Sequence, residues 1–189
     1  MQNTDQVVVL ALGSNQSLDG QGPEQLLRLA LAKISASGVR VLRTSRFYET
    51  PCFPAGAGPD YVNAVVVVDT RQEPGPLLEL LHKVEANLGR QRDRRWGART
   101  VDIDLIAHGQ RVLPDVAVFR TWLELPLDRQ QTEAPQQLIL PHPRLQDRAF
   151  VLVPMLDVAP DWSHPVLNQT TRQLCESLPK IARDEVKPI

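Results

Sequence analysis

Two aspartates spaced by one residue, Asp102 and Asp104, directly follow an arginine-rich stretch. Residues 89–105 read GRQRDRRWGARTVDIDL and contain five arginines and no lysine. Carboxylates are hard oxygen ligands that suit Mg²⁺, and the planar guanidinium group matches the oxygens of a phosphate. This combination predicts a site for a metal-bound polyphosphate.

The spacing of the two aspartates favours a shared face on a strand. Side chains at i and i+2 of a strand point the same way, so Asp102 and Asp104 would face one ligand. Their Cα atoms would lie about 7 Å apart, and two Mg²⁺ ions can sit between such carboxylates. A lone D-x-D is more often a solvated strand face, but a like-charged pair repels itself unless a cation offsets it. Without the aspartates, the arginines would instead favour a solvated or nucleic-acid-binding loop.

The overall charge gives no support for a polyanionic partner. Lys+Arg total 21 and Asp+Glu total 22, so the net charge is -1, and no nucleic acid or membrane surface is expected as a partner. The two cysteines, Cys52 and Cys175, match no metal or redox spacing and suit a reducing cytosol. No apolar run approaches the ~20 residues of a membrane span. We expect one cytoplasmic, monomeric domain over residues 1–189.

Apolar periodicity and turn residues predict the elements that position the aspartates. In chain order these are a strand at Val7–Leu12, a helix at Pro23–Ser35, strands at Val39–Tyr48 and Tyr61–Val68, a helix from Pro76 to Leu88, and a strand at Val101–Ala107. This βαββαβ order predicts an α+β fold of the ferredoxin-like type, an antiparallel sheet with helices packed on it. Two C-terminal helical patterns follow, Phe150–Leu156 and Thr170–Leu178.

The chain between the last sheet strand and the Pro-His-Pro segment is less regular. A short partner strand is expected to end near Leu113, and Pro114–Gln137 is expected to form an extended hairpin or surface insertion that contains a strand at Val116–Leu125. Ferredoxin-like folds host many unrelated functions, so the predicted fold does not identify the function of this chain.

Beyond the spacing argument, the residues themselves resemble a known family. The run RWGARTVDIDLI at Arg95–Ile106 closely resembles the motif of the hydroxymethyldihydropterin pyrophosphokinases of folate biosynthesis. The likeness extends to LALGSN at Leu10–Asn15, SRFYETP at Ser45–Pro51, DYVNAVV at Asp60–Val66, EANLGR at Glu85–Arg90 and PHPRLQDRAFVLVPMLDVAP at Pro141–Pro160. It therefore covers most of the chain.

The resemblance implies an enzyme that transfers pyrophosphate from ATP to the hydroxymethyl group of 6-hydroxymethyl-7,8-dihydropterin, with two Mg²⁺ ions held by Asp102 and Asp104. It implies catalytic roles for the same aspartates together with Arg90, Arg92 and Arg99. The residues implied to bind ATP are Glu85, Arg90, Arg92, Trp96, Arg99, His142 and Arg148. The residues implied to line the pterin site are Thr50, Pro51, Phe53, Tyr61, Asn63 and Phe150.

Several of these residues have an equally ordinary explanation. Glu85 could form a surface ion pair with Lys83 or Arg90 on its helix. Trp96 could pack over the nucleotide or brace the arginine stretch. His142 stands between two prolines, so its segment could have a purely conformational role.

The sequence also departs from the family pattern, which keeps two other functions open. Cys52-Phe53 replaces a common proline and aliphatic residue, Pro143 replaces an aromatic of some relatives, and Pro114–Gln137 is longer than usual. A two-metal phosphodiesterase or nuclease would use a D-x-D pair and arginines in a similar way, but would need further ligands for an activated water. A nucleotide- or pterin-binding paralogue without turnover is the non-enzymatic alternative.

Overall fold

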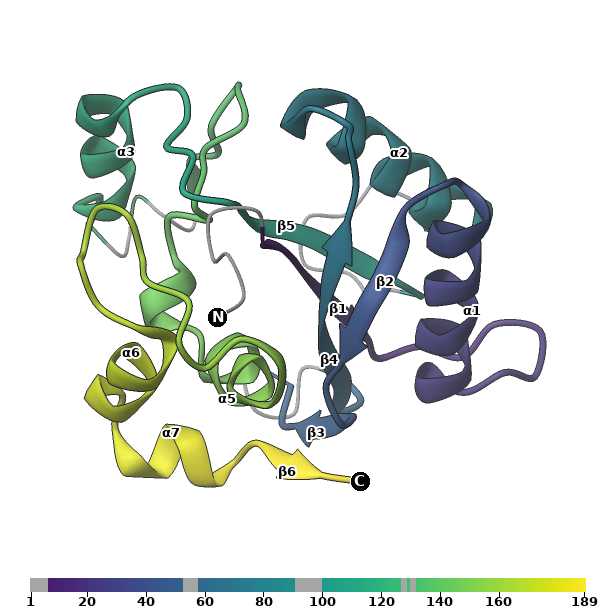
Figure 1. Cartoon of the computed structure of the whole chain (residues 1–189). Coiled ribbons are helices and arrows are strands. Elements are labelled where there is room, and N and C mark those ends of the chain that lie inside the picture. Colours follow the sequence, from purple (N-terminus) through teal and green to yellow (C-terminus); the bar gives the residue numbers. More distant parts are fainter. Residues whose placement is uncertain (1–6, 53–57, 91–99, 127–128, 130–131) are drawn as a thin grey trace.

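A six-stranded sheet organises the chain, with the strand order β5-β1-β4-β3-β6 and with β2 pairing separately with β4 (Figure 1). The computed structural model describes residues 7–52, 58–90, 100–126, 129 and 132–189. Every strand pair is antiparallel. The strands are β1 (Val8–Ser14), β2 (Arg40–Thr44), β3 (Tyr48–Thr50), β4 (Tyr61–Asp69), β5 (Asp102–His108) and β6 (Lys187–Pro188).

Helices cover both faces of the sheet. One face packs on α1 (Pro23–Ala36) and α2 (Pro74–Asn87), and the other packs on α5 (Ala149–Val158). Two shorter helices, α6 (Thr171–Ser177) and α7 (Lys180–Asp184), follow beside α5 (Figure 1). The ferredoxin-like βαββαβ order predicted from the sequence is confirmed. No helix in the described part of the chain is long and apolar enough to cross a membrane.

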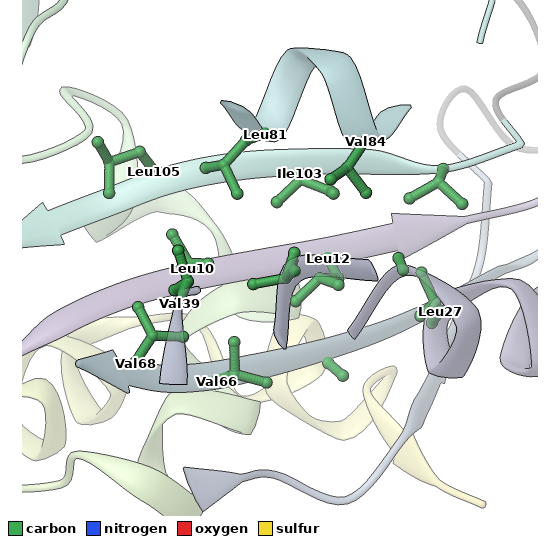
Figure 2. Close-up of a cluster of buried hydrophobic side chains, with 14 of the residues drawn as sticks. Leu10, Leu12, Leu27, Val39, Val66, Val68, Leu81, Val84, Ile103 and Leu105 are labelled. Carbon is green, nitrogen blue, oxygen red and sulfur yellow. The ribbon is translucent and has the colours of Figure 1, made fainter. Parts of the chain in front are cut away.

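The alternation of β1 explains how one sheet supports two cores. Leu10 and Leu12 point toward α1 and α2 and meet residues such as Leu27 and Val84 (Figure 2). Val9 and Ala11 point the other way, into the core formed with α5 and α6. Because both faces are covered, β1 is a nearly continuous apolar run, and this is the pattern that predicted it.

The strand predicted over Val39–Tyr48 is divided into β2 and β3. Ser45 stands at the break, and its backbone N–H donates to the Val65 carbonyl while its hydroxyl accepts the Val65 N–H, each at 2.9 Å. The Ser45 side chain thereby takes over a ladder bond, and the chain can turn before β3 begins. This break places β3 beside the start of β4, at one end of the sheet.

Two predictions for the segment after β5 are wrong. Residues Val116–Leu123 form a helix, α3, and not part of a strand, because the Asp115 carboxylate caps its start by accepting the Val118 N–H at 2.9 Å. Among the residues that suggested a strand, Phe119 is buried and Val118 and Trp122 are partly buried, whereas Val116 is exposed. The expected partner strand near Leu113 is a single bridge to Leu140.

A buried histidine joins α3 to the segment before α6. His164 is fully buried, with its ring 5.5 Å from that of Phe119 and 5.6 Å from that of Trp162. Its Nδ1 atom accepts the N–H groups of Val166 and Leu167, both at 3.2 Å. Burial lowers the pKa of His164 from 6.5 to about 4, so the ring is neutral at neutral pH.

The free energy of unfolding should therefore fall as the solution is acidified. Between pH 6.5 and about 4 the unfolded chain binds a proton that the folded His164 does not, so stability rises with pH in this window. Lowering the pH from 6.5 to 4.5 should cost about 2 kcal/mol from this group. Urea unfolding at several pH values measures the slope, which His164→Asn should reduce because asparagine keeps an acceptor but does not titrate. An unchanged slope in this variant would refute the assignment to His164.

Candidate active site

The start of β5 carries the two aspartates on the sheet face that α5 partly covers. Asp102 pairs across the sheet with Gly13 and Asp104 with Ala11, whereas Ile103 lies in the core on the opposite face. The exposed fractions of the side chains are 19% for Asp102 and 38% for Asp104. The shared face inferred from their spacing is therefore present. We call Asp102 and Asp104 the acidic pair.

Each member of the acidic pair contacts an arginine from a different element. Arg90, just after α2, places Nη1 2.6 Å from Asp102 Oδ1. Arg148, the N-cap residue of α5, donates from Nη1 to Asp104 Oδ2 at 3.0 Å. The pair is thus flanked by guanidinium groups from both sides of the sheet. Such an arrangement can hold cations on the carboxylates and anionic oxygens on the arginines.

Glu85 connects this site to the body of the protein. Its side chain is only 1% exposed, forms an ion pair with Arg90, and accepts the backbone N–H of Ile103 at 2.7 Å. Ile103 lies between the two aspartates, so Glu85 fixes both an arginine and the strand that carries the acidic pair. The alternative of a surface ion pair is correct about Arg90 as the partner but wrong about exposure, because Glu85 is buried.

His142 lies beside the basic flank of the site. The backbone N–H of His142 donates to the Ile106 carbonyl at 2.8 Å, and the ring atom Nδ1 accepts the backbone N–H of Arg144 at 3.1 Å. Burial, with the nearby cations Arg148 and Arg144, lowers the pKa of His142 well below its ordinary value. The ring is therefore neutral, and because Nδ1 is an acceptor, Nε2 carries the proton. His142 thus offers a neutral donor to a ligand.

Residues predicted to line a pterin site gather at the same end of the sheet. The Asn63 amide donates from Nδ2 to Thr50 Oγ1 at 2.8 Å, and Tyr61 pairs with Thr50 across β3 and β4. Phe150 lies in the first turn of α5 with its side chain 39% exposed, and the Arg148 guanidinium lies 5.6 Å from its ring centroid. An exposed aromatic face and a buried amide can together bind a flat heterocycle.

Gly13 allows the Asn63 side chain to lie close to the backbone of β1. A Cβ atom at Gly13 would lie 3.1 Å from Asn63 Oδ1, so a larger residue would displace the amide. Neither Gly13 nor Arg144 was among the predicted site residues, although both fall in stretches that carry the family likeness. A glycine at the end of a buried strand was the available signal for a close approach.

Four predicted site residues, namely Phe53, Arg92, Trp96 and Arg99, lie outside the described residues. Pro51 is exposed and directly follows β3. The other predicted residues are brought to the starts of β4 and β5 and to the start of α5, as described above.

The donor set fits Mg²⁺. Two carboxylates on one strand face, partly exposed and next to arginines, match the way in which magnesium is bound by one or two carboxylates with phosphate and water as the other ligands. No group of three or more His, Cys, Asp or Glu side chains that could hold a metal by themselves occurs in the described part of the chain. The two carboxylates therefore fit a metal that takes its other ligands from phosphate and water.

The fold and this site define the class, a ferredoxin-like protein with a carboxylate and arginine site suited to phosphoryl transfer. Residues 9–160 match the family described as 7,8-dihydro-6-hydroxymethylpterin-pyrophosphokinase (HPPK). The chain belongs to this family, whose members transfer a pyrophosphoryl group in folate biosynthesis.

Individual relatives agree with this membership. The chain is 36% identical over 153 residues to the 2-amino-4-hydroxy-6-hydroxymethyldihydropteridine pyrophosphokinase of Synechocystis, covering 80% of this chain and 68% of that one. It is 31% identical over 171 residues to the enzyme of the same name from Haemophilus influenzae, covering 88% and 92%. A crystal structure of Plasmodium falciparum HPPK-DHPS superposes with a TM-score of 0.63 at 18% identity, which shows the fold alone. This chain spans only 44% of that longer chain and covers 93% of its own length in the match.

Proposed function

We propose that the chain transfers the terminal pyrophosphate of ATP to the hydroxymethyl group of 6-hydroxymethyl-7,8-dihydropterin, releasing AMP. The observation that carries this proposal is the acidic pair, flanked by Arg90 and Arg148, next to the buried Thr50–Asn63 hydrogen bond. A phosphate site and a site for a flat polar heterocycle thus lie at one end of the sheet. We further propose that the enzyme is a cytoplasmic monomer and that its only partners are these two small-molecule substrates.

The roles of the side chains follow from their chemistry. Asp102 and Asp104 would hold two Mg²⁺ ions, which when bound supply positive charge that stabilises the phosphate oxygens. Arg90 and Arg148 would then exchange their carboxylate partners for phosphate oxygens, since a guanidinium binds both in the same geometry. His142 would donate from Nε2 to the nucleotide. These groups position the phosphates and offset their charge, and such positioning is the main work of phosphoryl-transfer enzymes.

The pterin side supplies orientation. Phe150 would stack on the pterin ring, and Asn63 and Thr50 would read its polar edge, so that the hydroxymethyl oxygen points at the β-phosphorus. In the transfer, the bond from this oxygen to the β-phosphorus forms, the bond from the β-phosphorus to the bridging α,β-oxygen breaks, and the hydroxyl proton is lost. AMP is the leaving group.

Pterin-dependent AMP release from ATP and Mg²⁺, with direct detection of the pyrophosphorylated pterin, tests the proposal. EDTA should abolish the reaction, and added Mg²⁺ should restore it. AMP release that does not depend on the pterin would indicate hydrolysis. Tight binding of ATP without any AMP would indicate a binding protein that has no turnover. Either result would require withdrawal of the proposed function.

The Asn63→Ala variant should separate the two substrate sites. Loss of the amide removes a buried polar contact that recognises the ring edge, and an unpaired polar edge commonly costs about 1–3 kcal/mol. We expect KM for the pterin to rise between about tenfold and a hundredfold while KM for ATP changes less than about twofold. Steady-state kinetics with each substrate varied in turn measure both values. An equal rise in both KM values would place Asn63 outside the pterin site.

A further inference from the structure

Asp157, near the end of α5, receives four hydrogen bonds from the junction between β2 and β3. The Arg46 backbone N–H and Nε donate to Oδ2, both at 3.1 Å, and Arg46 Nη2 donates to Oδ1 at 2.9 Å. The Tyr48 hydroxyl donates to Oδ2 at 2.9 Å. We call Arg46, Tyr48 and Asp157 the clamp. None of the three was assigned a role in the sequence analysis.

The hydroxyl of Tyr48 makes the clamp more than a surface ion pair. The Arg46 side chain is 62% exposed, and exposed ion pairs contribute little to stability by themselves. Tyr48, in contrast, is 2% exposed, so its hydroxyl needs an acceptor within the protein. Burial, together with the hydrogen bond to Asp157, raises the pKa of Tyr48 to about 12. The hydroxyl therefore remains a donor throughout the working pH range of ordinary enzymes.

The ring of Tyr48 lies against the start of α5. Tyr48 belongs to a small apolar cluster with Ala149 and with Val153, which is partly buried against it. Ala149, Val153 and Asp157 are spaced by four residues, so they form one stripe along the helix. Tyr48 thus meets this stripe through its ring and, at Asp157, through its hydroxyl. The clamp therefore contacts α5 at Asp157, and the apolar cluster contacts it nearer its start.

The same tyrosine is tied to the pterin residues. Tyr48 pairs across the sheet with Asn63 and precedes Thr50 by two residues, so Tyr48 and Thr50 point to the same face of β3. On the helix side, Phe150 directly follows Ala149. A shift of α5 relative to β3 would therefore change the distance between Phe150 and the Thr50–Asn63 pair. Asp157 itself lies seven residues from Phe150, about 10 Å along the helix axis, and so would not touch a pterin bound there.

We propose that Asp157 is a positioning residue for the pterin site, which holds α5 on β3 through Tyr48 and Arg46 and thereby sets the spacing between Phe150 and the Thr50–Asn63 pair. This inference rests on the proposed function. A loosened clamp lowers the fraction of molecules in which both walls of the site are in place, and apparent affinity falls in proportion to that fraction. Pterin binding should suffer more than ATP binding.

The test compares Asp157→Ala and Tyr48→Phe with wild type. Asp157→Ala should raise both KM and Kd for the pterin about tenfold or more, and Tyr48→Phe about threefold to tenfold, with KM for ATP within about twofold of wild type. The double variant should be no worse than Asp157→Ala alone, because both changes break the same hydrogen bond. Unfolding midpoints confirm that each variant is folded at the assay temperature.

Glu73→Gln is the matched control. Glu73, the N-cap residue of α2, forms an exposed two-point ion pair with Arg111, away from β3 and α5. The Glu73→Gln variant should leave KM for the pterin and KM for ATP unchanged. If Asp157→Ala is folded and binds the pterin like wild type, or raises both KM values equally, the positioning role is overturned while the proposed function stands. A wild type that neither binds nor modifies the pterin would overturn both.

Discussion

Asp104→Asn is expected to lower kcat about a hundredfold to a thousandfold at saturating ATP, pterin and Mg²⁺. Asparagine keeps the size of the side chain but removes the charge that would hold a divalent cation, and loss of one electrostatic stabiliser of a transition state commonly costs about 10²–10³ in rate. Asp102→Asn should have an effect of similar size, since the two carboxylates share one face of β5. Single-turnover assays that follow AMP measure the loss in the chemical step.

Asp69→Asn provides the matched control for this result. Asp69 ends β4 at the opposite end of the sheet and, like the acidic pair, is a strand aspartate that pairs with an arginine, Arg40. The Asp69→Asn variant should have the same kcat as the wild type. A variant at Asp102 or Asp104 that turned over at a near-normal rate, while folded, would exclude the acidic pair as the metal ligands.

The elements that support the acidic pair were predictable because local patterns agree with the tertiary structure there. α1, α2 and β5 show the period of their element, β1 and β4 are apolar runs of strand length, and turn or helix-stop residues follow them. The strand prediction for Val116–Leu123 failed because the composition of this segment favours a strand. The carboxylate of Asp115 caps the segment and stabilises a helix instead. β6 pairs with Tyr48 and Glu49, which lie far away in the sequence, so its local sequence does not predict it.

The candidate site was predictable in its residues but not in its contacts. Period two in the strand gives the shared face of Asp102 and Asp104 from the sequence alone. Their partners cannot be obtained in this way, because Arg148 follows Asp104 by 44 positions and reaches it only when α5 packs on the sheet. The role of the clamp has the same origin, since Asp157 and Tyr48 are 109 positions apart.

Burial is also a tertiary property, and Glu85 shows its effect on function. On the helix, Glu85 stands beside Val84, which faces the core, and Lys83, which is exposed, so the local pattern allows either environment. The structure places the carboxylate inside, where it pairs with Arg90 and accepts the Ile103 N–H. Replacing Glu85 should therefore disturb the positions of Arg90 and β5 together.

Glu85→Leu should destabilise the protein by about 3–5 kcal/mol, because it leaves the Arg90 cation and the Ile103 N–H without this acceptor in a buried setting. Glu85→Gln should cost less, since its amide oxygen can still accept from Ile103, but it should lower kcat/KM for ATP about tenfold to a hundredfold because Arg90 loses its charged partner. Urea unfolding and steady-state kinetics measure the two effects. If Glu85 only contacted ATP, Glu85→Leu would lose activity with less than about 1 kcal/mol of stability; a large loss of stability identifies Glu85 as the residue that holds Arg90 and β5 in place.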